Sequence, residues 1–159
     1  MKYSDDLFDE KNDLKFASIF GVLCAIASAL ATSYSVEAAY IFLAILIGNF
    51  IALKVDGLHH IITLIVYLAI SLVLGIPELS WAVLLVCILA AFSDEVGHEL
   101  ISKYTDNKFL NLFFEYRFVM KVVILLLAIC GIFSFWIFIC FISFEIAYEI
   151  GGIIFEKFN

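Results

Sequence analysis

The chain has 159 residues, of which 65% are hydrophobic and 16% charged, and its mean hydropathy is +1.11. A soluble domain carries about 45–50% apolar and about 25% charged residues, so this composition excludes an ordinary water-soluble domain. The net charge of −7, with only nine Lys and Arg, leaves no basic patch for phosphates and argues against nucleic-acid binding. We therefore expect an all-α, polytopic integral membrane protein.

The first half of the chain predicts three membrane spans behind a polar head at residues 1–13. Apolar runs cover residues 14–34, 36–53 and 58–76, and each is close to the ~20 residues that a helix needs to cross a bilayer. Pro77 follows the third run and is well placed to end a helix. The head is acidic, whereas a secretory signal peptide begins with basic residues, so we expect the first span to be retained.

The second half predicts three further spans, and the first of these is short of apolar residues. Its uninterrupted apolar part, residues 81–92, has 12 residues, so a span over residues 79–102 must take polar residues into the last third of the membrane. Residues 112–132 and 135–156 complete a bundle of six helices. Residues 104–117 either lie in the membrane interface or extend the fifth span.

The positions of Lys and Arg predict the orientation of these six spans. Basic residues collect on the cytoplasmic side of membrane proteins, and six spans place all nine on one side, whereas five spans would place Lys157 on the other. We therefore expect a multi-pass protein of the cell membrane with both termini in the cytoplasm. The lipid bilayer is its expected partner, and a homo-oligomer is compatible with this topology.

The three histidines lie at the predicted cytoplasmic edge, each with a carboxylate about one helical turn away. Residues three or four apart share a helix face, and a carboxylate paired in this way with a histidine is typical of divalent-metal sites in helical bundles. The sequence therefore predicts a divalent metal ion as cofactor. Its predicted ligands are Asp56, His59, His60, Asp94, Glu95 and His98.

The last predicted span carries two acidic residues, Glu145 and Glu149, four apart on one helix face. An ionisable residue at membrane depth is costly unless it is paired, and is a functional candidate by default. We expect Glu95 and Glu145 to be catalytic, with Glu99 and Glu149 as relay or supporting groups. The predicted substrate-binding cations are Lys54, Arg117 and Lys121, which would hold a lipid phosphate.

Each of these residues also has a purely structural interpretation. Asp56 could cap the third span, with both neighbouring histidines at headgroup level. Glu99 and Lys103 could form an interfacial ion pair, and Arg117 could be a basic residue that extends toward the headgroups. Glu145 could be a protonated acid hydrogen-bonded to a neighbouring helix.

Three functions are therefore compatible with the sequence. The first is a metal-dependent enzyme, a hydrolase or transferase, that acts on a membrane lipid or lipid phosphate. The second is a transporter subunit for divalent cations or protons, although the outer halves of several spans contain few polar residues. The third is a non-catalytic assembly protein, in which the polar groups hold helices together.

Overall fold

The computed structural model describes residues 2–11, 13–55, 57–104 and 107–158, and in them the chain is all-α. These residues form eight helices. Their bounds are α1 Lys2–Lys11, α2 Leu14–Tyr34, α3 Val36–Ile51, α4 Leu58–Leu74, α5 Trp81–Tyr104, α6 Lys108–Glu115, α7 Phe118–Ile129 and α8 Phe135–Phe158.

Three of the described helices are long and apolar enough to cross a membrane. They are α2, the part of α5 from Trp81 to Ile101, and the part of α8 from Phe135 to Phe155. Three further apolar helices, α3, α4 and α7, are shorter. The expectation of an all-α protein with membrane-spanning helices is confirmed, whereas the number of spans and the side of the termini stay predictions.

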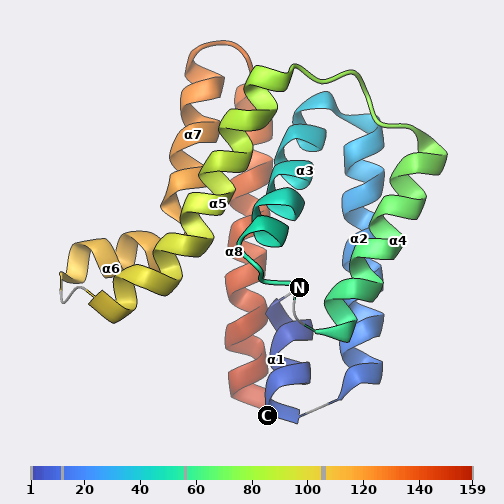
Figure 1. Ribbon diagram of the computed structural model, residues 1–159, viewed down its shortest axis with the longest axis vertical. Coiled ribbons are helices and arrows are strands. Elements are labelled where there is room, and N and C mark those ends of the chain that lie inside the picture. The colour runs from blue at the N-terminus through green and yellow to red at the C-terminus, as the bar shows by residue number, and fades with distance from the viewer. Residues whose placement is uncertain (1, 12, 56, 105–106, 159) are drawn as a thin grey trace.

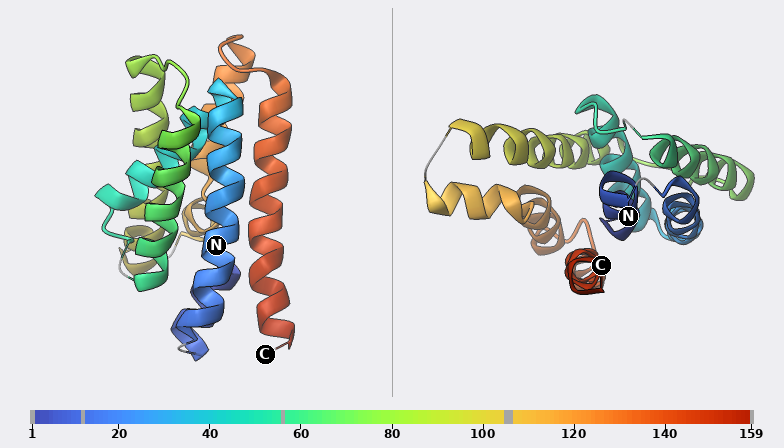
Figure 2. Two further views of the ribbon diagram at one scale, coloured as in Figure 1. Left: turned by 90° about the vertical axis from the view of Figure 1, so that its right-hand side faces the viewer. Right: turned by 90° about the horizontal axis from the view of Figure 1, so that it is seen from below.

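The apolar helices run in alternate directions along the long axis of the molecule (Figure 1). Helix α2 packs on α4, and α3 packs on α5. Helix α8 stands at one side of the bundle with α1 and α7 as its main neighbours (Figure 2). Helix α1 and the C-terminal end of α8 lie at the same end of the bundle (Figure 1).

Small residues let α2 approach its neighbours closely. Ala17, Gly21, Ala25 and Ala29 recur every fourth position along α2, and all four are buried. Small residues at this spacing are typical of helix contacts in membranes, because the backbones can come close together. A methyl group added at Gly21 would lie 2.2 Å from the hydroxyl oxygen of Thr63 on α4.

The contact between α3 and α5 has a similar small residue, Gly48. A Cβ atom at this position would lie 2.9 Å from Ala91 Cβ and 3.0 Å from the backbone nitrogen of Phe92. We expect Gly48→Ala to lower the unfolding free energy by about 1–3 kcal/mol through overpacking. Thermal unfolding of the detergent-purified protein measures this loss.

Gly151→Ala in α8 is the matched control for Gly48→Ala. The nearest atoms to an added Cβ at Gly151 belong to Tyr3 and lie 3.9 Å away, so the helix should gain the ordinary ~0.5–1 kcal/mol of a Gly-to-Ala change. Equal unfolding temperatures for the two variants would contradict close packing of α3 on α5.

The polar head forms a helix, which the sequence analysis did not foresee. Helix α1 packs on α2 and α8 through Leu7, which is buried with Ala17 and Phe155. The hydroxyl group of Ser4 is fully buried and donates to the carbonyl oxygen of Ala17 at 2.7 Å. These contacts place the acidic face of α1 against the start of α4.

The segment before the fifth apolar helix is a separate helix, α6, which projects from the side of the bundle (Figure 1). The side chain of Asn107 caps it by accepting from Phe109 N at 3.0 Å. Arg117 then adopts a left-handed backbone conformation, with φ of 49°, and ends the continuity between α6 and α7. The apolar run predicted at residues 112–132 is thus divided between two helices.

Candidate functional site

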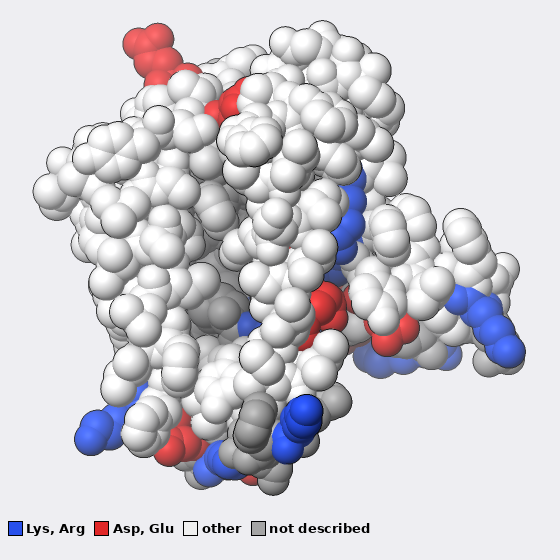
Figure 3. All heavy atoms as spheres, turned by 180° about the vertical axis from the view of Figure 1, so that it is seen from behind, with Lys and Arg blue, Asp and Glu red and all other residues white. Residues whose placement is uncertain are grey.

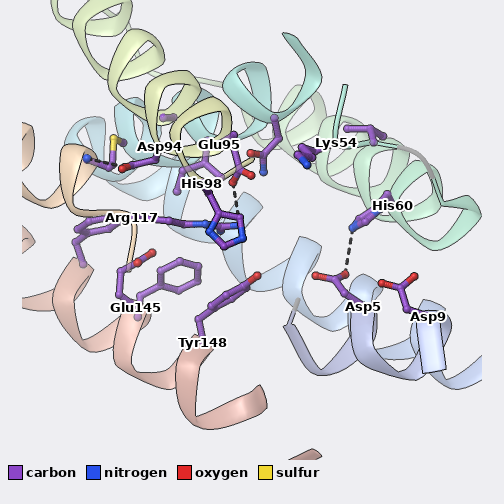
Figure 4. A pocket seen from close by; sticks show the side chains of 17 residues that line it. Asp5, Asp9, Lys54, His60, Asp94, Glu95, His98, Arg117, Glu145 and Tyr148 are labelled. Atoms are coloured by element: carbon purple, nitrogen blue, oxygen red, sulfur yellow. Dashed lines mark hydrogen bonds and ion pairs between the residues drawn. The ribbon is translucent and has the colours of Figure 1, made fainter. Parts of the chain in front are cut away.

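A polar cavity of about 370 Å³ lies between α1, α3, α5 and α8. Its floor toward the bundle interior is apolar and includes Ala91, Met120 and Phe141. The other walls carry most of the ionisable side chains that the sequence singles out (Figure 4). The titratable residues that line it are Asp5, Asp9, Lys54, His60, Asp94, Glu95, His98, Arg117, Glu145 and Tyr148.

Asp5 from α1 meets two adjacent histidines at the start of α4. One carboxylate oxygen, Asp5 Oδ1, lies 3.3 Å from His59 Nε2 and 3.1 Å from His60 Nε2. Donor atoms of these three residues all lie within 4.8 Å of one another. His60 lines the cavity, whereas the ring of His59 is buried between His60 and Phe8.

The three residues fit a divalent metal ion by their donor chemistry. Two imidazoles and one carboxylate are a common ligand set for zinc and non-haem iron, and three protein ligands leave coordination positions open for water or substrate. His59 is 1% exposed, and the ring nitrogen that it presents to Asp5 is Nε2.

Asp94 on α5 caps the N-terminus of α7. Its two carboxylate oxygens accept from the backbone nitrogens of Val119 at 2.9 Å and Met120 at 2.7 Å. The first backbone N–H groups of a helix have no partner within the helix and carry partial positive charge. Asp94 is 2% exposed, and its two hydrogen bonds hold the start of α7 against α5.

The next residue, Glu95, forms a buried ion pair across the cavity. Glu95 Oε1 lies 3.0 Å from Arg117 Nη2 (Figure 4), and Glu95 is 6% exposed. The guanidinium group also lies over the ring of Tyr148 on α8, 5.3 Å from its centroid. Arg117 thus connects α5 to α8, and its left-handed backbone turns its side chain into the bundle.

A second ion pair joins α7 to α8. Lys121 Nζ lies 3.0 Å from Glu145 Oε2, and both side chains are mostly buried. Lys121 Nζ also donates to the backbone carbonyl oxygen of Tyr116. Glu145 therefore has a cation partner, and Glu149, one turn further along α8, is half-buried and outside the cavity wall in the described part of the chain.

The cavity rim carries a more exposed cluster. Glu99 accepts from both Lys54, at 3.1 Å, and Lys103, at 3.2 Å. Their side chains are between 38% and 61% exposed. Exposed pairs of this kind contribute little to stability, so this cluster marks the edge of the cavity rather than its chemical centre.

The structure thus divides the predicted metal ligands between different environments. His59 and His60 come together with Asp5. Asp94 and Glu95 are engaged with α7 and Arg117, and His98 lines the cavity near Arg117 (Figure 4). The predicted ligand Asp56 lies outside the described residues.

The sequence analysis missed three titratable residues of the cavity wall, Asp5, Asp9 and Tyr148. Asp5 and Asp9 are four apart in the acidic head, a spacing that places both on one face of any helix formed there. That spacing was an available signal. Comparison with protein-family models, curated proteins and solved structures gives no match to this chain.

Proposed function

We propose that this chain is a membrane enzyme that depends on a divalent metal ion held by Asp5, His59 and His60, and that it acts on a membrane lipid. It would cross the bilayer six times, with both termini and the polar cavity on the cytoplasmic side. The observation that carries the proposal is the group of two imidazoles and a carboxylate on the wall of a one-sided polar cavity.

The distribution of charge supports the proposed orientation. The upper end of the molecule in Figure 3 displays acidic but no basic side chains, whereas basic side chains gather toward the lower end. The vertical direction is the same in Figures 1 and 3. In Figure 1 the lower end of the molecule holds α1 and the C-terminal end of α8. Since Lys and Arg collect in the cytoplasm, this distribution supports a cytoplasmic position for the cavity end.

The chain's own residues would divide the work in the cavity. Asp5 and His60 lie at one side, whereas Glu95, His98 and Arg117 lie at the other (Figure 4). A metal ion bound at the first group would supply a Lewis acid and an activated water. Across the cavity, His98 is positioned to exchange a proton with a bound substrate, while Arg117 orients the Glu95 carboxylate.

A path across the whole membrane, as a transporter needs, finds no support in the packing. The apolar floor of the cavity belongs to a buried cluster that continues through Ile41, Cys87 and Ile124 to Phe133, between α7 and α8 at the opposite end. A one-sided cavity suits an enzyme rather than a channel.

An activity assay on native lipids tests this proposal. The purified protein, reconstituted in vesicles of extracted membrane lipids, is expected to convert one lipid class after addition of Zn²⁺, Mn²⁺ or Fe²⁺. A metal chelator should stop the conversion, and Asp5→Asn should abolish it, while Lys103→Gln at the exposed rim should keep it. Lipid mass spectrometry before and after incubation gives the readout. Unchanged lipids with all three ions would contradict the enzymatic proposal.

A further inference from the structure

A second, apolar pocket adjoins the polar cavity. It has a volume of about 150 Å³ and lies between α2, α3 and α4. Its walls are formed mainly by apolar side chains, such as Phe42, Leu46 and Leu64, with Tyr67 at one end. Five residues line both spaces: Ile45, Asn49, Val55, His60 and Phe144.

The two spaces therefore form one amphipathic site with His60 and Asn49 at the junction. From His60 to Tyr67 the pocket follows α4 for seven residues, or about 10 Å at 1.5 Å per residue. In the proposed orientation this direction leads from the cytoplasmic headgroup region toward the middle of the bilayer. A lipid of the cytoplasmic leaflet has the same orientation, with its polar group at the interface and its hydrocarbon chain inward.

The charges of the cavity indicate which head group it would accept. Five carboxylates line it, Asp5, Asp9, Asp94, Glu95 and Glu145, against the two cations Lys54 and Arg117. Each nearby cation is already paired with a carboxylate: Arg117 with Glu95 at 3.0 Å, Lys54 with Glu99 at 3.1 Å, and Lys121, outside the lining, with Glu145 at 3.0 Å.

An anionic head group would therefore meet cations that already have carboxylate partners, and it would lie beside the carboxylates of Asp5 and Asp9. An uncharged ester or hydroxyl group meets no such penalty, and Asn49 and His60 at the junction can exchange hydrogen bonds with it. This counts against the lipid phosphate that the sequence alone left open.

We propose that the joined cavities bind a single-chain amphiphile with an uncharged head group, its chain in the apolar pocket and its head beside Asn49 and His60. This substrate class rests on the proposed function, because His60 is also a proposed metal ligand. It goes beyond that function in naming where the hydrocarbon chain lies and which charge the head group carries.

Photochemical labelling tests the proposal. A monoacylglycerol with a diazirine in its acyl chain is added to phosphatidylcholine vesicles that contain the full-length protein. After irradiation, labelled residues are mapped by mass spectrometry. We expect labels on pocket residues of α2, α3 and α4, and competition by unlabelled monoacylglycerol. Labels that resist competition and spread over lipid-exposed residues such as Leu23 and Leu30 would overturn the proposal.

Two variants on α2 separate the pocket from the lipid-facing surface. Ser28 lines the pocket, whereas Ala27 is exposed and outside it. Ser28→Phe should fill the pocket and reduce competed labelling by about tenfold or more, and Ala27→Phe should leave it unchanged. Leu46→Trp fills the same pocket from α3. It replaces Ser28→Phe in the experiment if that variant does not fold. Equal labelling of the filled and control variants would overturn the assignment.

A charged probe and a metal assay complete the experiment. The phosphate analogue, a photoreactive lysophosphatidic acid, should label the pocket residues more weakly, and equal or stronger labelling would overturn the head-group assignment. Metal content is measured in the same samples. Bound metal without competed labelling refutes this inference alone, whereas competed labelling in a protein that binds no metal supports the amphiphile site and refutes the metal enzyme.

Discussion

Replacing His60 by Ala is expected to abolish tight metal binding. His60 would supply one of three protein ligands, and its ring also stacks on His59, with ring centroids 4.1 Å apart. Loss even of a group that only supports a metal ligand typically costs 10–100-fold in affinity, so loss of a ligand should cost at least about 100-fold. Titration against a chromophoric chelator measures the metal affinity. Asp5→Asn should lose metal affinity to a similar extent.

His98→Ala is the matched control for this variant. His98 lines the same cavity but lies on α5, on the side of Arg117 and Glu95 (Figure 4). Its removal should leave metal affinity within about threefold of the parent protein, while lipid conversion falls by about 10²-fold or more, as for a proton-transfer residue. If His98→Ala loses the metal and His60→Ala keeps it, the metal lies on the other side of the cavity.

Replacing Arg117 by Met is expected to destabilise the bundle strongly. The substitution leaves the buried carboxylate of Glu95 without the cation that lies 3.0 Å from it. Removing one partner of a buried ion pair typically costs about 3–5 kcal/mol, because the remaining charge is uncompensated. The packing of the guanidinium on Tyr148 is lost as well. Thermal unfolding in detergent gives the size of the effect.

The double variant Arg117→Met with Glu95→Gln shows whether the uncompensated charge is the cause. It removes both charges and should recover most of the lost stability. Lys54→Met breaks the more exposed pair with Glu99 and should leave the unfolding temperature nearly unchanged. A double variant as unstable as Arg117→Met alone would mean that packing, rather than charge, explains the role of Arg117.

The positions of the apolar helices could be predicted from the sequence because each depends on a local property, a long apolar run between polar breaks. The predicted runs at residues 14–34 and 36–53 correspond to α2, Leu14–Tyr34, and α3, Val36–Ile51. The break at Arg117 could not be predicted in the same way. A left-handed backbone is uncommon for a residue other than Gly, and the side chain of Arg117 pairs with Glu95 on another helix, a contact that local sequence does not show.

The candidate site could be predicted only in part, for a similar reason. His59 and His60 attract attention because they are adjacent histidines at the edge of an apolar run. Their carboxylate partner in the structure is Asp5, more than fifty residues away along the chain, and its position depends on the packing of α1 through Leu7 and Ser4. A search by local spacing finds neighbours on the same helix and misses such partners.

Asp94 illustrates another kind of contact that the local pattern does not reveal. It lies four residues before His98 on one helix face, as a ligand pair would. The backbone N–H groups of Val119 and Met120 nevertheless occupy both of its oxygens. Only the packing of α7 against α5 reveals this, and a single sequence carries no record of that contact.

X-ray absorption spectroscopy of the zinc-loaded protein tests the central claim most directly. The account predicts one tightly bound ion per chain, with two imidazole nitrogens and one or more oxygens at about 2.0–2.1 Å, and loss of this signal in Asp5→Asn. A spectrum without imidazole scattering, or one that is unchanged in Asp5→Asn, would contradict a metal ion held by Asp5, His59 and His60.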